Sequence, residues 1–221
     1  MNQIVQAAQL ACHDIYDPVT PQVFDKLYRV GETVCGIALI DGHLFIANQG
    51  TENTAGWEAD GDIVPTAHPT LGNLHTGFYR NIVALIKLLA IDIAAEFAVD
   101  IPIVVTGHSK GAGEAALLGA CLKLAGFNVV QAILFACPRP GYQGLANWLH
   151  ANLPGISFRN APSDFPALGD PVPMVPINPY VEPYSHVMID VAPGGLQDFD
   201  PFARHAAELY RQGACAWGSV Q

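Results

Sequence analysis

Short apolar runs alternate along this chain with longer segments of helical spacing. Residues 33–40 (TVCGIALI) and 43–50 (HLFIANQG) are two such runs, and the Asp41-Gly42 pair between them is a strong signal for a β-hairpin turn. The next long segment, NIVALIKLLAIDIAAEFAV, is interrupted by three charged residues at roughly helical spacing. It predicts a long, mostly buried helix near residues 77–98 with a thin exposed stripe.

The remaining elements follow from the same patterns. Apolar runs that do not alternate predict buried strands, and amphipathic or small-residue segments predict helices. The expected strands are residues 101–107, 129–138, 156–161 and 184–191. The expected helices are residues 3–13, 21–29, 113–127, 141–152 and 201–213, the last ended by Gly213. From residue 43 onward strands alternate with helices, which predicts an α/β fold with a mostly parallel central sheet flanked by helices.

Composition narrows the class of protein. The 221 residues contain no repeat, low-complexity tract or linker, so one domain over residues 1–221 is expected. With 51% hydrophobic and 14% charged residues, the chain is not expected to be disordered. The net charge of -10 disfavours nucleic acid as a partner and predicts no attraction to anionic membranes. No run of about 18 apolar residues occurs, so no transmembrane segment is expected.

The N-terminal sequence and the cysteines bear on the compartment. MNQIVQAAQLACHDIYDP has no basic leader, and His13 and Asp14 interrupt its apolar stretch, so no signal peptide is visible. We therefore expect a cytoplasmic protein or one exported by a non-classical route. The five cysteines show no C-x-x-C spacing, which predicts neither a disulfide framework nor a zinc site, although a single bridge stays open. Cys121 and Cys137 are expected to be small buried apolar residues.

The stretch VVTGHSKGAG, residues 104–113, places Ser109 among three glycines, after a predicted buried strand and before a predicted helix. This is the context that a G-x-S-x-G nucleophile elbow requires. Such a serine occupies a strained backbone conformation that exposes its hydroxyl. Gly107 and Gly111 lack the side chains that would collide where the strand and the helix cross. We therefore expect Ser109 to be a nucleophile; the alternative is a glycine-rich turn with an incidental serine.

A serine hydroxyl is a poor nucleophile until a base takes its proton. In a sheet of this kind the partners follow in the order serine, acid, histidine. Asp164 and Asp170 both lie in the loop after the expected strand at 156–161. Pro171 and Pro173 would keep the backbone beside Asp170 stiff, whereas Asp164 resembles a turn-forming aspartate. Asp170 is therefore the favoured acid.

Two histidines follow that acid. His186 lies inside an expected strand, where a structural role is the better interpretation. His205 lies beside the last expected helix, where a loop could bring it to the serine, and it is the favoured base. His108 is too close to Ser109 along the backbone to point at its hydroxyl.

Taken together, these motifs resemble the class 3 lipase family, which includes fungal triacylglycerol lipases and plant acylhydrolases. The likeness runs from about Gly36 to Tyr210. GHSKGAG is similar to the family's GHSLGGA elbow, and NQGTENTAGWEADGDIVP followed by LHTGFY is similar to its RGT...W..D and vH.GF segments. FACPRPG is similar to fGaPRvG, GDPVPMVP to the acid loop nDpVP.lP, and HAAELY to the histidine helix H.le.Y. No single motif is specific, but the combination is.

The resemblance implies an α/β-hydrolase fold with Ser109 as nucleophile, Asp170 as acid and His205 as base, the same three residues that the chemistry selects. It adds an oxyanion hole. The backbone N–H of Lys110 would be one donor, and Thr51 would be the second through its backbone N–H, with its hydroxyl as a further candidate.

In the family, a mobile lid lies between the RGT and vH.GF motifs. Here that segment covers about residues 52–67, with Trp57 as its apolar anchor. It would cover the site in water and open at a lipid surface; a static loop is the alternative. Because the segment is acidic, deep insertion into an anionic bilayer is not expected. The resemblance also makes His186 the family's strand histidine and not the base.

The chain departs from the family pattern at two positions. Gln49 stands where the family has arginine before Gly-Thr, so whatever that arginine anchors is missing or replaced. Lys110 stands where the family has leucine after the nucleophile. A backbone donor does not depend on the side chain, so the oxyanion role survives. The cation would favour an anionic group of the substrate or pair with Glu114.

The sequence thus predicts a serine ester hydrolase, a lipase or esterase that forms an acyl-enzyme on small-molecule or lipid esters, with a lipid–water interface as a candidate setting. No metal or organic cofactor is expected. One alternative is a phospholipase or other acylhydrolase with the same triad. The other is a catalytically silent hydrolase-fold domain that binds a lipid or a partner, although a silent copy has no need for all three triad residues.

Overall fold

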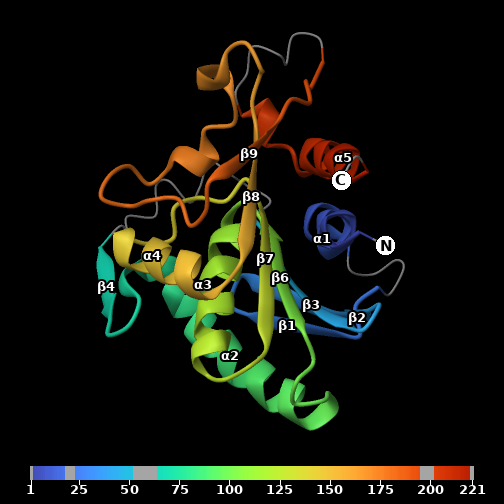
Figure 1. Cartoon of the computed structure of the whole chain (residues 1–221), viewed down its shortest axis with the longest axis vertical. Coiled ribbons are helices and arrows are strands. Elements are labelled where there is room, and N and C mark those ends of the chain that lie inside the picture. Colours follow the sequence, from blue (N-terminus) through green and yellow to red (C-terminus); the bar gives the residue numbers. More distant parts are fainter. Residues whose placement is uncertain (1, 18–22, 52–63, 195–201, 220–221) are drawn as a thin grey trace.

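A computed structural model describes residues 2–17, 23–51, 64–194 and 202–219 of the chain (Figure 1). Among these residues the main sheet has the strand order β1-β2-β3-β6-β7-β8-β9. Its strands are β1 (Lys26–Val30), β2 (Thr33–Ile40), β3 (His43–Asn48), β6 (Ile103–His108), β7 (Val129–Phe135), β8 (Gly155–Asn160) and β9 (His186–Ile189). The strands β1, β2 and β3 pair antiparallel, and every pairing from β3 to β9 is parallel. The predicted mostly parallel sheet is confirmed.

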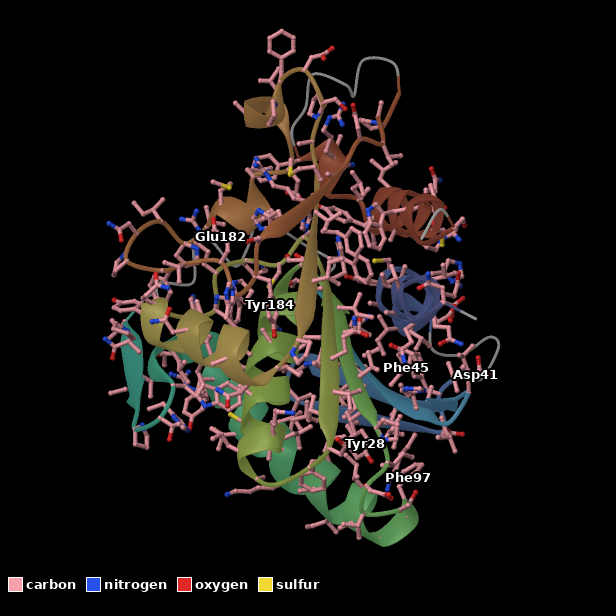
Figure 2. All side chains as sticks on the ribbon, in the orientation of Figure 1. Tyr28, Asp41, Phe45, Phe97, Glu182 and Tyr184 are labelled. Carbon is pink, nitrogen blue, oxygen red and sulfur yellow. The ribbon has the colours of Figure 1, made fainter. Side chains whose placement is uncertain are left out.

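Five α-helices among the described residues cover the two faces of this sheet. They are α1 (Gln3–Cys12), α2 (Thr76–Glu96), α3 (Lys110–Leu124), α4 (Gln143–Asn152) and α5 (Ala207–Gly218). One core cluster contains residues of α2, α3 and α4, and a second contains residues of α1 and α5 (Figure 1). In β3, Leu44 and Ile46 face the first cluster, whereas Phe45, labelled in Figure 2, belongs to the second. This alternation is what a strand buried on both faces requires.

The hairpin turn forms where the sequence predicts it. Asp41 has φ 47° and Gly42 has φ 76°, the positive values that a two-residue hairpin turn needs. The long helix also forms close to its predicted bounds, as α2.

The helix expected at residues 21–29 is wrong. Residues Lys26–Val30 form strand β1, which pairs antiparallel with β2 at the edge of the sheet. Leu27 is exposed and Tyr28 is buried, which is the alternation of a strand with one covered face. The pairing with β2 therefore outweighs the weak local helical preference of this segment.

The last helix also differs from its expectation. Residues Ala203–His205 form a short 3₁₀ turn, η5, and Ala206 then adopts an extended backbone before α5 begins. The helix continues past Gly213 to Gly218. A Cβ at Gly213 would lie only 2.7 Å from Cδ1 of Ile189 in β9. This glycine therefore allows the helix to lie close to the sheet, and it does not end the helix.

A second, two-stranded sheet was not expected from the sequence. It consists of β4 (Pro65–His68) and β5 (Gly72–His75). Residues 65–67, the end of the predicted lid segment, therefore form one strand of a hairpin. Residues 52–63, Trp57 included, lie outside the described residues.

The structure also bears on membranes and thiols. None of the described helices is both long enough and apolar enough to span a membrane.

All five cysteines are free. Cys137 is fully buried as expected, and burial raises the pKa of its thiol well above the ordinary value. Cys121 is only partly buried and packs at the border of the first core cluster.

Candidate active site

Ser109 occupies the tight turn between β6 and α3. Its φ of 57° and ψ of -133° are strained for a residue with a side chain, and its backbone N–H donates to the Phe135 carbonyl at 3.0 Å. A Cβ at Gly107 would collide with the backbone of Gly111, and a Cβ at Gly111 would collide with the Asn48 carbonyl. The two glycines therefore permit the close crossing that holds the serine at the end of the strand.

The imidazole of His205 lies between Ser109 and Asp170. Its Nε2 is 2.8 Å from the Ser109 hydroxyl oxygen, and its Nδ1 is 2.8 Å from Oδ2 of Asp170. All three residues are buried. A carboxylate accepts and cannot donate, so the Nδ1 must carry the proton in this pair and Nε2 is left to accept one. The three residues come from the turn before α3, the loop after β8, and η5.

Two further donors hold the Asp170 carboxylate. The backbone N–H of Val172 donates to Oδ1 at 2.9 Å, and the Tyr210 hydroxyl donates to Oδ2 at 2.6 Å. Burial raises the pKa of Tyr210 well above its ordinary value, so its hydroxyl keeps the proton that it donates. The same hydroxyl oxygen accepts from the backbone N–H of Asn160 at 2.9 Å. Asp170 is thus fixed by three donors from three segments of the chain.

The loop after β3 lies against the nucleophile. A Cβ at Gly50 would lie 3.2 Å from the Cβ of Ser109, so the loop that carries Thr51 is adjacent to the serine. The Thr51 hydroxyl is buried and has no hydrogen-bond partner among the described residues. Lys110 is the first residue of α3, and a first-turn N–H has no carbonyl partner within its helix. The positive end of the α3 dipole also lies at this point.

The side chain of Lys110 turns toward a buried carboxylate. Its Nζ is 3.7 Å from Oε1 of Glu114, which also accepts from Thr33 Oγ1 at 3.2 Å and from Asn81 Nδ2 at 2.9 Å. Glu114 is fully buried, and burial raises the pKa of its carboxyl group although Lys110 opposes the shift. Of the two roles considered for the Lys110 cation, the structure therefore favours the pairing with Glu114.

The competing acid and base lie elsewhere. Asp164 is exposed in the loop before η2 (Pro166–Leu168). His186 lies in β9 and lines a surface pocket of about 300 Å³ beside α4, together with Glu182 and Tyr184, both labelled in Figure 2. Burial lowers the pKa of His186. Neither residue hydrogen-bonds to Ser109 or His205 in the part of the chain that the structure describes.

Sequence reasoning missed three residues around this site. Tyr210 is the tyrosine of HAAELY, five positions after His205, and its place in the motif similar to the family's H.le.Y was the sequence signal that could have found it. The other two are Tyr16, in the 3₁₀ turn η1 (Asp14–Tyr16), and His108, which hydrogen-bond to each other at 3.0 Å across 92 positions. Nothing local in the sequence indicates that contact. Among the described residues, no group of three or more His, Cys, Asp or Glu side chains is arranged to hold a metal ion.

Solved structures of lipases share this fold at low sequence identity. Mono- and diacylglycerol lipase from Aspergillus oryzae superposes with a TM-score of 0.73 at 20% identity, covering 97% of this chain and 96% of that one. Rhizomucor miehei lipase in complex with its propeptide gives 0.68 at 18% identity, covering 96% and 78%. A triacylglycerol lipase described as having a serine protease triad as its catalytic centre gives 0.68 at 20% identity, covering 85% and 79%. These likenesses show the α/β-hydrolase fold.

Sequence comparison is more specific about the family. No curated protein sequence matches the chain. Residues 45–179, more than half of the chain, match the family model described as Lipase (class 3). The matched segment contains the Ser109 turn and the Asp170 loop, and it ends before His205. The chain therefore belongs to the class 3 lipase family.

Proposed function

We propose that this protein is a serine carboxylic ester hydrolase of the lipase and esterase type, with residues 1–221 as one catalytic domain. The single observation that carries the proposal is the His205 imidazole held 2.8 Å from both the Ser109 hydroxyl and the Asp170 carboxylate. These distances fall within the range required for proton transfer between a nucleophile and its base. Membership of a lipase family supports the same reaction class.

In the proposed mechanism, the Ser109 oxygen attacks the ester carbonyl while Nε2 of His205 takes the hydroxyl proton. Asp170 accepts from Nδ1, which orients the ring and stabilises the imidazolium that forms. The tetrahedral oxyanion receives hydrogen bonds from the backbone N–H groups of Lys110 and Thr51. The imidazolium then protonates the departing alcohol. A water molecule, deprotonated by His205, hydrolyses the acyl-enzyme and restores Ser109. The steps use only protein groups and water.

The substrates we propose are acyl esters, chiefly uncharged lipids. The chain carries a net charge of -10, which opposes binding to anionic aggregates. The Lys110 cation faces Glu114 at 3.7 Å, so it is engaged by the protein and is not offered to an anionic head group. This contact is why we rank a neutral ester above a phospholipid. The lid over about residues 52–67 remains part of the proposal, with Trp57 as its apolar anchor.

The decisive test is Ser109→Ala on a chromogenic short-chain ester. We expect kcat to fall by at least about 10⁴-fold, because the nucleophile is lost while substrate binding remains. Ser157→Ala is the matched control, since Ser157 is a buried serine in β8 and should leave kcat unchanged. A fluorophosphonate should label Ser109 in the wild type only. Hydrolysis that survives Ser109→Ala, or a folded wild type that is not labelled, would overturn the proposal.

A panel of substrates would identify which class of ester the protein hydrolyses. Esters of increasing acyl length, a triglyceride emulsion and zwitterionic phospholipid vesicles should be compared below and above the concentration at which an interface forms. We expect hydrolysis of neutral esters to exceed that of phospholipids, with a rate increase at the interface if the segment at about residues 52–67 acts as a lid. Preferential phospholipid hydrolysis would replace the lipase proposal by the phospholipase alternative.

A further inference from the structure

His108 is a buried ring beside the nucleophile that the proposed mechanism does not use. It is the last residue of β6, and only 4% of its surface is exposed. Its ring lies 4.8 Å from the ring of His205, with the two planes tilted by 32°. A polar side chain so deeply buried must have its hydrogen bonds satisfied, so its partners indicate what it holds in place.

Both ring nitrogens of His108 have a partner. Nε2 lies 3.0 Å from the backbone carbonyl oxygen of His205, and Nδ1 lies 3.0 Å from the hydroxyl of Tyr16. A carbonyl oxygen can only accept a hydrogen bond, so the Nε2 of His108 carries the proton and donates a hydrogen bond to the His205 carbonyl. Nδ1 of the neutral ring then accepts from the Tyr16 O–H. Burial, together with the neighbouring His205, lowers the pKa of His108 well below its ordinary value, which agrees with a neutral ring.

The segment that carries His205 has little support of its own. η5 is a single 3₁₀ turn, and Ala206 after it is extended. The carbonyl of Arg204 accepts from Asn160 Nδ2 at 3.1 Å, and the carbonyl of His205 accepts from His108. These two bonds attach consecutive carbonyls of the turn to strands β8 and β6. Asp170 sets the orientation of the His205 ring, whereas His108 sets the position of its backbone.

Tyr16 reaches the other half of the site as well. A Cβ at Gly50 would collide with the Tyr16 hydroxyl and with the His108 carbonyl, so the hydroxyl lies directly against the loop that leads to Thr51. Tyr16 lies in η1 and outside the segment that matches the family model. One hydroxyl from the N-terminal segment therefore contacts both the partner of the base and the loop beside the nucleophile.

We propose that Tyr16 and His108 form a positioning pair for the catalytic base, which holds the His205 backbone so that Nε2 meets the Ser109 hydroxyl. The inference rests on the proposed function of Ser109 and His205. Neither residue touches the reacting atoms, so both act through His205. This role requires a neutral His108. A positive charge 4.8 Å from the His205 ring would repel the imidazolium that His205 becomes during catalysis and make it less stable.

The primary test is Tyr16→Phe, which removes one hydroxyl and keeps the ring. We expect kcat on a soluble short-chain ester to fall about three- to tenfold with KM unchanged, because one neutral hydrogen bond is lost and no substrate contact changes. Tyr28→Phe is the matched control. It removes the hydroxyl that donates to Asp92 at 2.9 Å, which hydrogen-bonds to neither Ser109 nor His205, and it should leave kcat unchanged.

Substitutions of His108 provide a second test of the positioning pair. His108→Gln keeps an N–H donor for the His205 carbonyl, whereas His108→Leu keeps none. We expect the leucine variant to lose more than about tenfold in kcat and the glutamine variant to recover part of that loss. Tyr16→Phe should lower kcat by a smaller factor in the His108→Leu background than in the wild type, because the hydrogen bond between the two residues is already gone. If the leucine variant does not fold, Tyr16→Phe and His108→Gln carry the test.

Titration with a fluorophosphonate separates positioning from loss of structure. A positioning role predicts that every folded Tyr16→Phe molecule is labelled, but more slowly than the wild type. A smaller labelled fraction with unchanged rate per labelled site would assign the pair a purely structural role and overturn the inference, as would an unchanged kcat. A wild type that is not labelled at Ser109 would instead reject the proposed function itself, so the two failures are distinguishable.

Discussion

The two halves of the site differ in how their buried polar atoms are paired. On the base side, Asp170 accepts from Val172, Tyr210 and His205, and the His205 carbonyl accepts from His108. On the oxyanion side, several buried side-chain atoms have no partner among the described residues: both polar atoms of Asn48, the Thr51 hydroxyl and Oε2 of Glu114. The polar groups that hold the acid and the base are thus paired within the described chain, whereas these atoms on the oxyanion side are not.

This difference indicates where preorganisation comes from. The bonds of the base side exist before any substrate arrives. They join the Asp170 loop to η5 and α5, join that loop to its own following residues, and join η5 to β6. On the oxyanion side, the unpartnered atoms make no hydrogen bonds with other described residues that would fix this half in advance. Substitutions in the two halves should therefore have different consequences.

The largest effect is expected from Asp170→Asn, which breaks the base side at its centre. The amide would donate to Nδ1 of His205 and favour the tautomer with the proton on Nε2, which cannot accept the serine proton. We expect kcat to fall by about 10³- to 10⁴-fold in a steady-state ester assay. Asp164→Asn is the control, because Asp164 is exposed and should leave kcat unchanged. Equal losses in the two variants would remove Asp170 from its proposed role.

An intermediate effect is expected at Glu114, on the oxyanion side. Glu114→Ala leaves the mostly buried Lys110 without its counter-charge, which should lower the free energy of unfolding by about 3 kcal/mol. Glu114→Gln keeps the Oε1 acceptor for Thr33 and Asn81 and should cost less. Urea unfolding of the three proteins at one pH would measure both differences. Equal stabilities would mean that the buried pair contributes nothing.

The same residue predicts a pH dependence. Burial raises the pKa of Glu114, so the folded state binds this proton more tightly than the unfolded state. Its contribution to stability is therefore fully present below the ordinary carboxyl pKa and is lost as the pH rises through the raised value. The stability of the wild type relative to Glu114→Gln should therefore fall as the pH rises above the ordinary carboxyl pKa. A pH-independent difference in urea unfolding would contradict this sign.

The smallest effect is expected from Tyr210→Phe, which removes one of the three donors to Asp170 and leaves the other two. We expect a loss of about three- to tenfold in kcat and of about 1–2 kcal/mol in stability, the latter because the Asn160 N–H also loses its acceptor. Kinetics and urea unfolding on the same preparation would measure both. An unchanged kcat would mean that two donors suffice to hold the carboxylate.

The sequence alone determined the alternation of main-sheet strands with helices from α2 to α4, the hairpin at Asp41-Gly42 and the serine turn. Each of these depends on a local signal: unbroken apolar runs, Asp41-Gly42, and glycines without which strand and helix could not cross. The order of serine, aspartate and histidine also selected the three side chains that the structure brings together. The assignment of their chemical roles remains a proposal.

Only the tertiary structure decided the rest. Residues Lys26–Val30 are a strand because β2 offers them an edge to pair with, and Gly213 lies inside a helix because β9 approaches it closely. The bond between Tyr16 and His108 joins positions 92 apart, and Glu114 is buried because Thr33 and Asn81 meet it from other elements. Local propensity acts over a few residues, whereas such contacts depend on packing between distant segments, so no pattern along the chain could reveal them.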